Sequence, residues 1–341
     1  MREGKKMRKK EVVLLFVSLA FFAIICPNRV LAAPYYQGKM IKIIVGGPTG
    51  GGYDRVARLL AKHLPKHIPG NPTIIIENMA GASSIIAANY IYNLAKADGM
   101  TIGAPQRGIP TAQILKIEGA RFDAAKYSWI GSAAVEATVL TIRTDLPYKT
   151  FNDLLKAKSP IMFGQTGPTE SSSQFLMLLK EFLGLNLKMI MYPHTPEAML
   201  ALERKEVDGR AGSYSSMKPF IERGLIRPLI RGKASEAGIE DLPVDEDLAK
   251  DSRAKTIMGM RSAGEQIGRP YVTPPRTPEN VMKILRDAFA KAINDPELKE
   301  DAKKTMTEVK YTPADECLKV IDFLLNQPED IIKEFSKYMK F

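Results

Sequence analysis

The sequence predicts an α/β protein in which helices flank mostly parallel sheets. Short β-branched apolar runs alternate along the chain with longer stretches of helical periodicity, which is the pattern of repeated strand–helix–strand units. The same succession of strand, small-residue turn and helix recurs in both halves of the chain. Without its first 33 residues, the 341-residue chain is still long enough for two domains of ~150 residues each.

The N-terminus has the pattern of a secretory signal peptide. A strongly basic segment precedes an apolar run from Val12 to Ile25, and the small residues Ala32 and Ala33 follow. We expect residues 1–33 to be a signal peptide that is cleaved after one of these two alanines, with export to the periplasm. The apolar run is shorter than the ~20 residues of a membrane span, and a retained anchor is the alternative.

Charge and cysteine content narrow the classes of partner. The formal net charge is +11, of which residues 1–33 contribute +5. The remaining basic side chains are spread along the chain without a dense block, so we expect an anionic solute as partner and no nucleic acid. Cys317 is the one cysteine beyond the predicted signal peptide, which excludes an intrachain disulfide after cleavage and favours core packing of its side chain.

A glycine-rich turn follows the first predicted strand. Residues 41–45 form a β-branched apolar run, and helical periodicity starts at Asp54. Between them, Gly50, Gly51 and Gly52 leave backbone N–H groups unshielded, and the helix N-terminus adds partial positive charge behind them. These residues predict an anion-binding loop, with a plain tight turn as the alternative. The loop lacks the Walker A lysine and the G-x-G-x-x-G spacing, which favours an anion smaller than a nucleoside triphosphate.

The later elements continue the alternation of strands and helices. Strands are expected over residues 73–77, 100–103, 129–132, 139–143, 161–163, 188–192, 209–213, 225–230 and 271–272. Helical periodicity covers residues 85–96, 145–158, 174–183, 195–206, 278–294, 296–307 and 330–338. Residues 240–268 are richer in charged and small residues and have irregular periodicity, so no element is assigned to them.

Small and polar residues follow several of these strands. Residues 80–84 repeat the first turn in composition, and residues 105–108 follow the third strand. In an open parallel sheet such turns share the edge at which ligands bind. Arg107 either forms a surface salt bridge there or pairs with a ligand carboxylate in a bidentate fork. Asp54 is expected to position the first loop, by capping the helix or accepting a hydrogen bond, because its charge would repel a carboxylate.

Catalytic and metal-binding patterns are weak. His63 and His67 have the spacing of a metal pair, but Pro65 lies between them and favours a solvated helix end instead. Glu136 and Glu170 lie near predicted turns and are candidates for an acid/base pair, whereas solvated or capping acids are the usual case. The sequence has no G-x-S-x-G elbow, and we expect no catalytic residue, no metal and no cofactor.

Five stretches together resemble the solute-binding proteins of tripartite tricarboxylate transporters, the Bug receptor family. They are PTGGGYDRVARLLA (48–61), IIIENMAGASSIIAANYI (74–91), KADGMTIGAP (96–105), FGQTGPTESSS (163–173) and MYPHTPEAMLALERKEVD (191–208). The resemblance implies a two-lobe periplasmic-binding-protein fold, in which each lobe is a mostly parallel sheet flanked by helices and the ligand cleft lies between the lobes. The expected division is residues 34–140 plus 241–341 in lobe 1 and residues 141–240 in lobe 2.

The resemblance also implies which residues bind the ligand. The loops 49–54 and 80–84 are expected to hold a carboxylate through backbone amides, hydroxyls and waters. Ser83 and Ser84 stand where the family has glycines, and Pro193 stands where the family has a lysine, with a histidine next to it. The expected ligand-binding residues are Thr49, Gly50, Gly51, Gly52, Asp54, Gly81, Ala82, Ser83, Ser84, Arg107, Glu136, Thr166, Gly167, Thr169, His194 and Ser213.

We therefore expect a periplasmic solute-binding receptor for a small organic carboxylate, either a di- or tricarboxylate or an aromatic carboxylate. It would deliver this ligand to the membrane permease subunits of a tripartite transporter. The receptor is expected to be a monomer, not an enzyme, and to close around its ligand. Two alternatives remain, a ligand-sensing accessory protein for a sensor kinase and a periplasmic hydrolase. The missing nucleophile constellation argues against the hydrolase.

Overall fold

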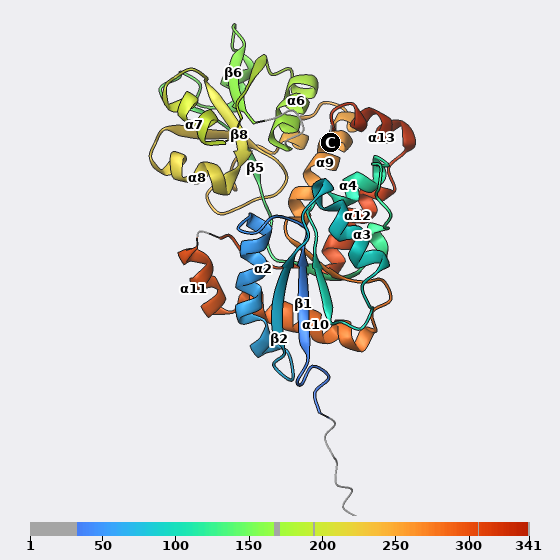
Figure 1. The fold of residues 1–341 in the computed structure, drawn as a ribbon. Coiled ribbons are helices and arrows are strands. Elements are labelled where there is room, and N and C mark those ends of the chain that lie inside the picture. Colours follow the sequence, from blue (N-terminus) through green and yellow to red (C-terminus); the bar gives the residue numbers. More distant parts are fainter. Residues whose placement is uncertain (1–32, 167–170, 194, 306, 340–341) are drawn as a thin grey trace, which may run out of the picture.

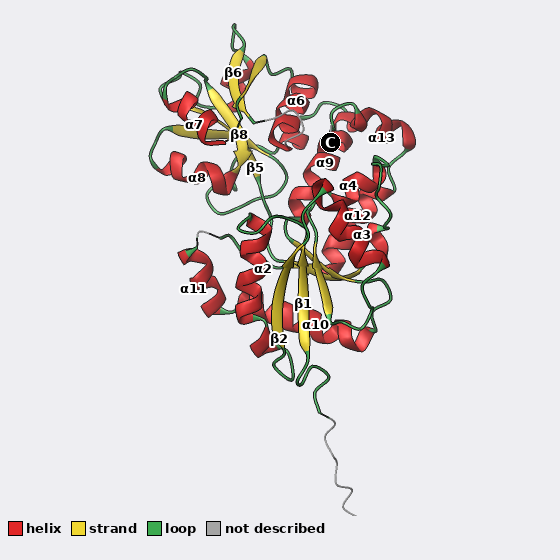
Figure 2. Cartoon of the chain, in the orientation of Figure 1, coloured by secondary structure: helices red, strands yellow, loops and turns green. Residues whose placement is uncertain are grey.

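The computed structural model describes residues 33–166, 171–193, 195–305 and 307–339. They form two lobes, each a β-sheet with helices packed on it, as Figures 1 and 2 show. The two-lobe α/β fold expected from the sequence is confirmed. The predicted signal peptide, apart from its last residue, lies outside the described residues. Within the described part of the chain, no helix combines the length and the apolar character that a membrane crossing requires.

The first lobe contains a six-stranded sheet in the order β11-β4-β10-β3-β1-β2. Its strands are β1 (Met40–Val45), β2 (Thr73–Asn78), β3 (Thr101–Ala104), β4 (Ser128–Ser132), β10 (Pro270–Thr273) and β11 (Thr312–Pro313). The flanking helices are α2 (Gly52–His63), α3 (Ile85–Asn93), α4 (Ile109–Ile114), α10 (Glu279–Asn294), α11 (Pro296–Lys304) and α12 (Ala314–Leu325).

Strand β1 is mostly apolar because both faces of the sheet are covered along most of its length. Ile43 and Val45 pack into a core that includes side chains of α2 and α10. Ile44 points to the other face and packs with side chains of α3 and α12, among them Cys317. The core packing expected for Cys317 is therefore confirmed, and burial raises the pKa of its thiol to about 12. A strand covered on both faces has no polar side, which is why Ile43, Ile44 and Val45 are consecutive apolar residues.

The second lobe contains a five-stranded sheet in the order β7-β6-β8-β5-β9. Its strands are β5 (Thr138–Arg143), β6 (Ile161–Gln165), β7 (Leu187–Met191), β8 (Gly209–Ser213) and β9 (Ile226–Arg231). Its helices are α5 (Phe151–Leu155), α6 (Ser171–Leu183), α7 (Thr195–Glu203) and α8 (Tyr214–Glu222).

Both sheets are mixed, and most strands of each sheet run in one direction. β1 is parallel to β2 and β3, and β6 is parallel to β7 and β8. β10 is antiparallel to β3 and β4, and β5 is antiparallel to β8 and β9. The reason is the path of the chain between the lobes. It leaves the first lobe through the end of β4 and returns through β10, so β10 must run in the opposite direction.

Helix α9 (Ser252–Ile267) packs against helices of both lobes, including α6 and α12, and against α13 (Glu329–Ser336). The sequence indicates no element within residues 240–268 because its periodicity there is irregular, and the structure has this helix in that stretch. Most of the α9 side chains are buried, among them Ile257, Met258 and Met260. A helix covered on most sides has no continuous polar face, and the helical periodicity on which the sequence prediction depends is consequently weak.

Candidate functional site

The side chain of Asp54 holds the glycine-rich loop in place through a hydrogen bond to its backbone. Its buried carboxylate accepts hydrogen bonds from the Gly50 backbone N–H at 2.8 Å and from Arg58 Nε at 2.9 Å. Burial acts to raise the pKa of Asp54, but the hydrogen bonds from Arg58 and Gly50 outweigh it and hold the pKa below its ordinary value. The Gly51 N–H bonds the Pro48 carbonyl at 3.2 Å. Backbone donors for a ligand therefore come from the first turn of α2, which starts at Gly52 and whose N–H groups have no intrahelical acceptors.

The second loop has an unusual backbone conformation. Three consecutive residues have positive φ, at 44° for Ala82, 50° for Ser83 and 77° for Ser84. Residues other than glycine rarely adopt this left-handed backbone conformation. The buried Ser84 Oγ accepts a hydrogen bond from the Gln106 N–H at 3.0 Å, which ties this loop to the one after β3. A Cβ on Gly46 would lie 1.8 Å from this hydroxyl, so the glycine makes room for Ser84.

Tyr53 joins the first loop to the loop after β3 and to the chain that returns from the second lobe. Its hydroxyl accepts a hydrogen bond from the Arg107 N–H at 3.0 Å and donates one to the Gly268 carbonyl at 3.3 Å. The guanidinium carbon of Arg269 lies 4.1 Å from the centroid of its ring. A Cβ on Gly52 would lie 2.8 Å from Arg269 Nη2, so this guanidinium sits directly against the start of α2.

The carboxylate of Glu136 lies between the guanidinium groups of Arg107 and Arg269. Glu136 pairs with Arg107 Nη1 through one oxygen and with Arg269 Nη2, at 3.2 Å, through the other. All three side chains are mostly buried. Burial acts to raise the pKa of Glu136, but Arg107 and Arg269 outweigh it and hold the pKa below its ordinary value.

A second ion-pair group lies on α9. Arg261 Nη1 is 2.5 Å from Glu265 Oε1 one helical turn away, and Arg261 Nη2 is 3.4 Å from Asp245 Oδ2. The Arg261 guanidinium also lies over the Phe175 ring of α6, 4.6 Å from its centroid. Burial raises the pKa of Asp245 to about 7 although Arg261 opposes this shift. Charged side chains from α9 therefore reach the space between the lobes in already neutralised pairs.

These groups line a cleft of about 480 Å³ between the lobes. Side chains and glycines from the first lobe, from the start of α6, from α9 and from the C-terminal segment form its wall. They are Gly52, Tyr53, Ser83, Gln106, Arg107, Gly108, Thr111, Glu136, Ser171, Gln174, Arg261, Gly264, Glu265, Arg269, Phe335 and Met339.

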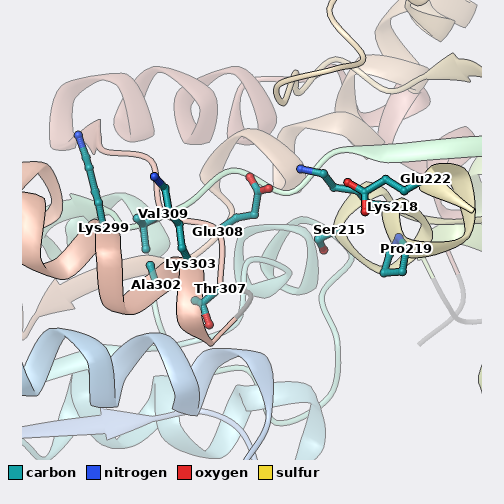
Figure 3. A pocket seen from close by; sticks show the side chains of 10 residues that line it. All are labelled: Ser215, Lys218, Pro219, Glu222, Lys299, Ala302, Lys303, Thr307, Glu308 and Val309. Carbon is teal, nitrogen blue, oxygen red and sulfur yellow. The ribbon is translucent and has the colours of Figure 1, made fainter.

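A groove of about 490 Å³ also lies between the lobes, next to this cleft (Figure 3). Ser215, Lys218, Pro219 and Glu222 line it from α8 of the second lobe, and Lys299, Ala302, Lys303, Thr307, Glu308 and Val309 line it from α11 and the following residues. A smaller hollow joins the two spaces, because it is lined both by Glu136 and Arg269 and by Ser215 and Glu308. The space between the lobes thus extends past Arg107 and Arg269 to the groove between α8 and α11.

The cleft brings together only part of the predicted site. Gly52, Ser83, Arg107 and Glu136 line it, whereas Gly50, Gly51, Asp54, Gly81, Ala82 and Ser84 belong to the same two loops but are not among the lining residues. Thr49 bonds Asn78 Oδ1 at 3.1 Å, Ser213 bonds Ser216 Oγ at 2.8 Å, and neither these nor Thr166 is among the lining residues. Gly167, Thr169, Glu170 and His194 lie outside the described residues.

Several lining residues were missed by the sequence analysis. Tyr53 and Arg269 contact each other, yet they come from opposite ends of the chain. Arg261 and Glu265 belong to α9, which was not expected as a helix. Their spacing of four residues is the one signal that the sequence offers for this pair.

The two histidines pair with carboxylates at the start of α11 and within it. His63 Nε2 lies 2.9 Å from Asp301 Oδ2, and His67 Nε2 lies 2.8 Å from Asp295 Oδ2, so both histidines tie the end of α2 to α11. His63 is 4% exposed, and its expected place at a solvated helix end is wrong. Across the described ranges, no three side chains among His, Cys, Asp and Glu are placed to hold a metal ion.

Comparison with known proteins identifies similar sequences and folds. Residues 56–336 match the model of the tripartite tricarboxylate transporter family receptor. The chain is 26% identical over 324 residues to a UPF0065 protein of Bordetella pertussis, with 93% of this chain and 96% of the relative covered. Its fold is similar to that of a TctC solute-binding protein from Polaromonas, with a TM-score of 0.71 and 19% identity over 89% of this chain and 99% of the other. It is also similar to the periplasmic binding protein BugD, with a TM-score of 0.60 and 23% identity over 89% of this chain and 98% of the other.

Two further solved structures with a similar fold contain a dicarboxylate. MatC from Rhodopseudomonas palustris has bound malate (TM-score 0.56, 19% identity, 89% of this chain and 99% of the other). Another R. palustris protein was solved with adipate (TM-score 0.60, 20% identity, 87% and 97%).

Proposed function

The chain belongs to the family of tripartite tricarboxylate transporter receptors, and we propose that it is a periplasmic receptor that binds a small organic carboxylate in the cleft between its lobes. It acts as a binding protein rather than an enzyme and passes its ligand to membrane permease subunits. The observation that carries the ligand class is the position of Arg269, whose guanidinium lies against Gly52 at the start of α2. A fixed cation beside a helix N-terminus favours a carboxylate.

Three groups are suitable for holding that carboxylate. The first turn of α2 supplies backbone N–H donors and partial positive charge. Arg269 supplies a guanidinium that the Tyr53 ring holds in place. Ser83 supplies a hydroxyl from the second loop. The bound malate and adipate of two proteins with a similar fold support the same ligand class.

The proposal is tested by screening the purified mature protein against mono-, di- and aromatic carboxylates by thermal shift, followed by calorimetry. We expect at least one carboxylate to raise the melting temperature and the Arg269→Gln variant to lose at least tenfold in affinity for it. Arg223→Gln is the matched control, because Arg223 pairs with Glu203 on the surface of the second lobe. A screen in which no carboxylate binds contradicts the proposal.

Export has its own test. N-terminal sequencing of the periplasmic fraction should find the mature chain starting after Ala32 or Ala33. Recovery of intact Met1 on a membrane-bound form contradicts cleavage.

A further inference from the structure

Glu136 bridges two arginines in the wall of the cleft. Its Oε2 pairs with Arg107 Nη1 and its Oε1 pairs with Arg269 Nη2, so one carboxylate bridges two guanidinium groups in the wall of the cleft. Its backbone is fixed as well, since the Glu136 N–H donates to the Glu265 carbonyl at 3.2 Å. Glu136 is 19% exposed, so part of the carboxylate faces the cleft.

We propose that Glu136 is a specificity-determining residue that disfavours ligands with a second carboxylate relative to ligands with a neutral far end. This inference rests on the proposed function, because it presupposes that one carboxylate of the ligand binds beside α2. It goes further by assigning the choice between mono- and dicarboxylates to a single side chain.

The physical argument starts from the arginines. A free guanidinium offers a fork of two N–H groups to an incoming carboxylate, but Glu136 already uses one nitrogen of Arg107 and one of Arg269. The ring of Tyr53 lies beneath Arg269, which restricts its rotation towards another partner. Because Arg269 is proposed to hold the first carboxylate, a second ligand carboxylate that approaches Arg107 meets the Glu136 charge at close range, and like charges in a partly desolvated cleft repel strongly. A neutral far end meets no such repulsion, and a hydroxyl there can donate to Glu136.

The other charges around the cleft do not change this balance. Arg261 is neutralised by Glu265 within α9, at 2.5 Å. Asp245 lies behind that pair and is fully buried. Arg107 thus remains the cation whose availability to a second ligand carboxylate depends on Glu136.

The test compares two pairs of ligands that differ by one carboxylate, adipate with hexanoate and succinate with butyrate. Calorimetry on the wild type and on Glu136→Gln gives the ratio of dicarboxylate to monocarboxylate affinity. We expect this ratio to rise at least tenfold in Glu136→Gln for at least one pair, with the dicarboxylate itself binding more tightly than to the wild type. Glu136→Asp keeps the charge and should keep the wild-type ratio.

A purely structural role of Glu136 predicts the opposite sign. If it only held the two guanidinium groups in place, Glu136→Gln would bind both members of each pair more weakly with an unchanged ratio, and that result overturns the proposal. Glu136→Asn serves as the second neutral variant should the glutamine variant fail to fold, as judged by circular dichroism. If the wild type and the variants bind no carboxylate at all, the proposed function itself fails. If the wild type binds carboxylates and the ratio does not rise, only this inference fails.

Discussion

At the scale of single residues, the second loop stores backbone strain beside the cleft. Three consecutive residues, Ala82 to Ser84, adopt left-handed backbone angles without a glycine among them. Each such residue costs about 1 kcal/mol or more. Ser84 has a compensating role because its hydroxyl accepts the Gln106 N–H, whereas the side chain of Ser83 faces the cleft. The strain at Ser83 is therefore retained beside the proposed ligand site.

Replacing Ser83 with glycine should stabilise the protein. Glycine adopts a φ of 50° without steric cost, and the gain is only partly offset by its larger backbone entropy in the unfolded chain. We expect the free energy of unfolding in urea to rise by about 0.5–1 kcal/mol. Ala290→Gly in helix α10 is the control and should lower it by about 1 kcal/mol. A loss of stability in Ser83→Gly would show that the serine hydroxyl holds the loop together.

Gly52→Ala tests the contact between α2 and Arg269. A Cβ at this position would lie 2.8 Å from Arg269 Nη2, so the guanidinium must move away from the helix N-terminus. A charge-assisted hydrogen bond contributes about 1.5–3 kcal/mol, so its loss should weaken carboxylate binding about tenfold or more. Calorimetry on the folded variant measures this.

Gly47→Ala is the matched control in the same loop, because a Cβ there meets only Gln106 Nε2, at 3.8 Å. Its affinity should remain within about twofold of the wild type, which corresponds to roughly 0.4 kcal/mol. Equal losses in both variants would show that the loop, rather than Arg269, controls binding.

At the scale of elements, the crossing segment 133–137 is held by the chain that returns between the lobes and by the side chain of Glu236. The Ala133 N–H bonds the Arg269 carbonyl, the Arg269 N–H bonds the Ala134 carbonyl, and Glu236 Oε1 accepts the Ala137 N–H at 2.7 Å. Burial raises the pKa of Glu236 to about 7, with a further contribution from the carboxylate of Glu308. A carboxyl group that is protonated in the folded state therefore lies beside the connection between the lobes.

This glutamate predicts a pH dependence of stability. Its folded pKa of about 7 exceeds its ordinary value of 4.5, so the folded state binds more protons than the unfolded state between these values. The free energy of unfolding should therefore fall as the pH rises from about 5 to about 7. Asp245, whose pKa is also raised to about 7, acts in the same direction.

Glu236→Gln isolates the contribution of Glu236. It should stabilise the protein by about 3 kcal/mol at pH 8 and by less than about 1 kcal/mol at pH 5, because the pKa rises from 4.5 to about 7 and one unit corresponds to about 1.4 kcal/mol. Urea unfolding at the two pH values measures this difference. Glu222→Gln, exposed on α8, should change stability by less than about 0.5 kcal/mol at either pH. An equal effect of Glu236→Gln at both pH values contradicts the assigned protonation.

At the scale of the whole molecule, the groove between α8 and α11 lies where the lobes would approach each other. Lys218 lines it from one lobe and Lys299 from the other (Figure 3). Hinge closure around a ligand brings such opposing surfaces together. Spin labels on cysteines placed at these two positions should therefore report a shorter distance when a saturating carboxylate is added. The thiol of Cys317 is buried and should stay unlabelled.

A labelled pair within the first lobe, Lys283 and Lys299, is the control and should show no change. Small-angle scattering of the unlabelled protein should give a smaller radius of gyration with ligand. If neither the spin-label distance nor the radius of gyration changes when the ligand binds, closure of the lobes on binding is contradicted.

The sequence by itself determined the α/β class, the glycine-rich loop and the family, and it placed Arg107 and Glu136 in the site. These follow from local signals, because apolar runs, glycine turns and helical periodicity reflect burial and backbone conformation over a few residues. The tertiary structure decided how the charged groups combine. Arg269 reaches Gly52 only because β10 inserts between β3 and β4, and α9 lacks a polar face because both lobes cover it. Such contacts depend on pairing between distant segments, which local periodicity does not encode.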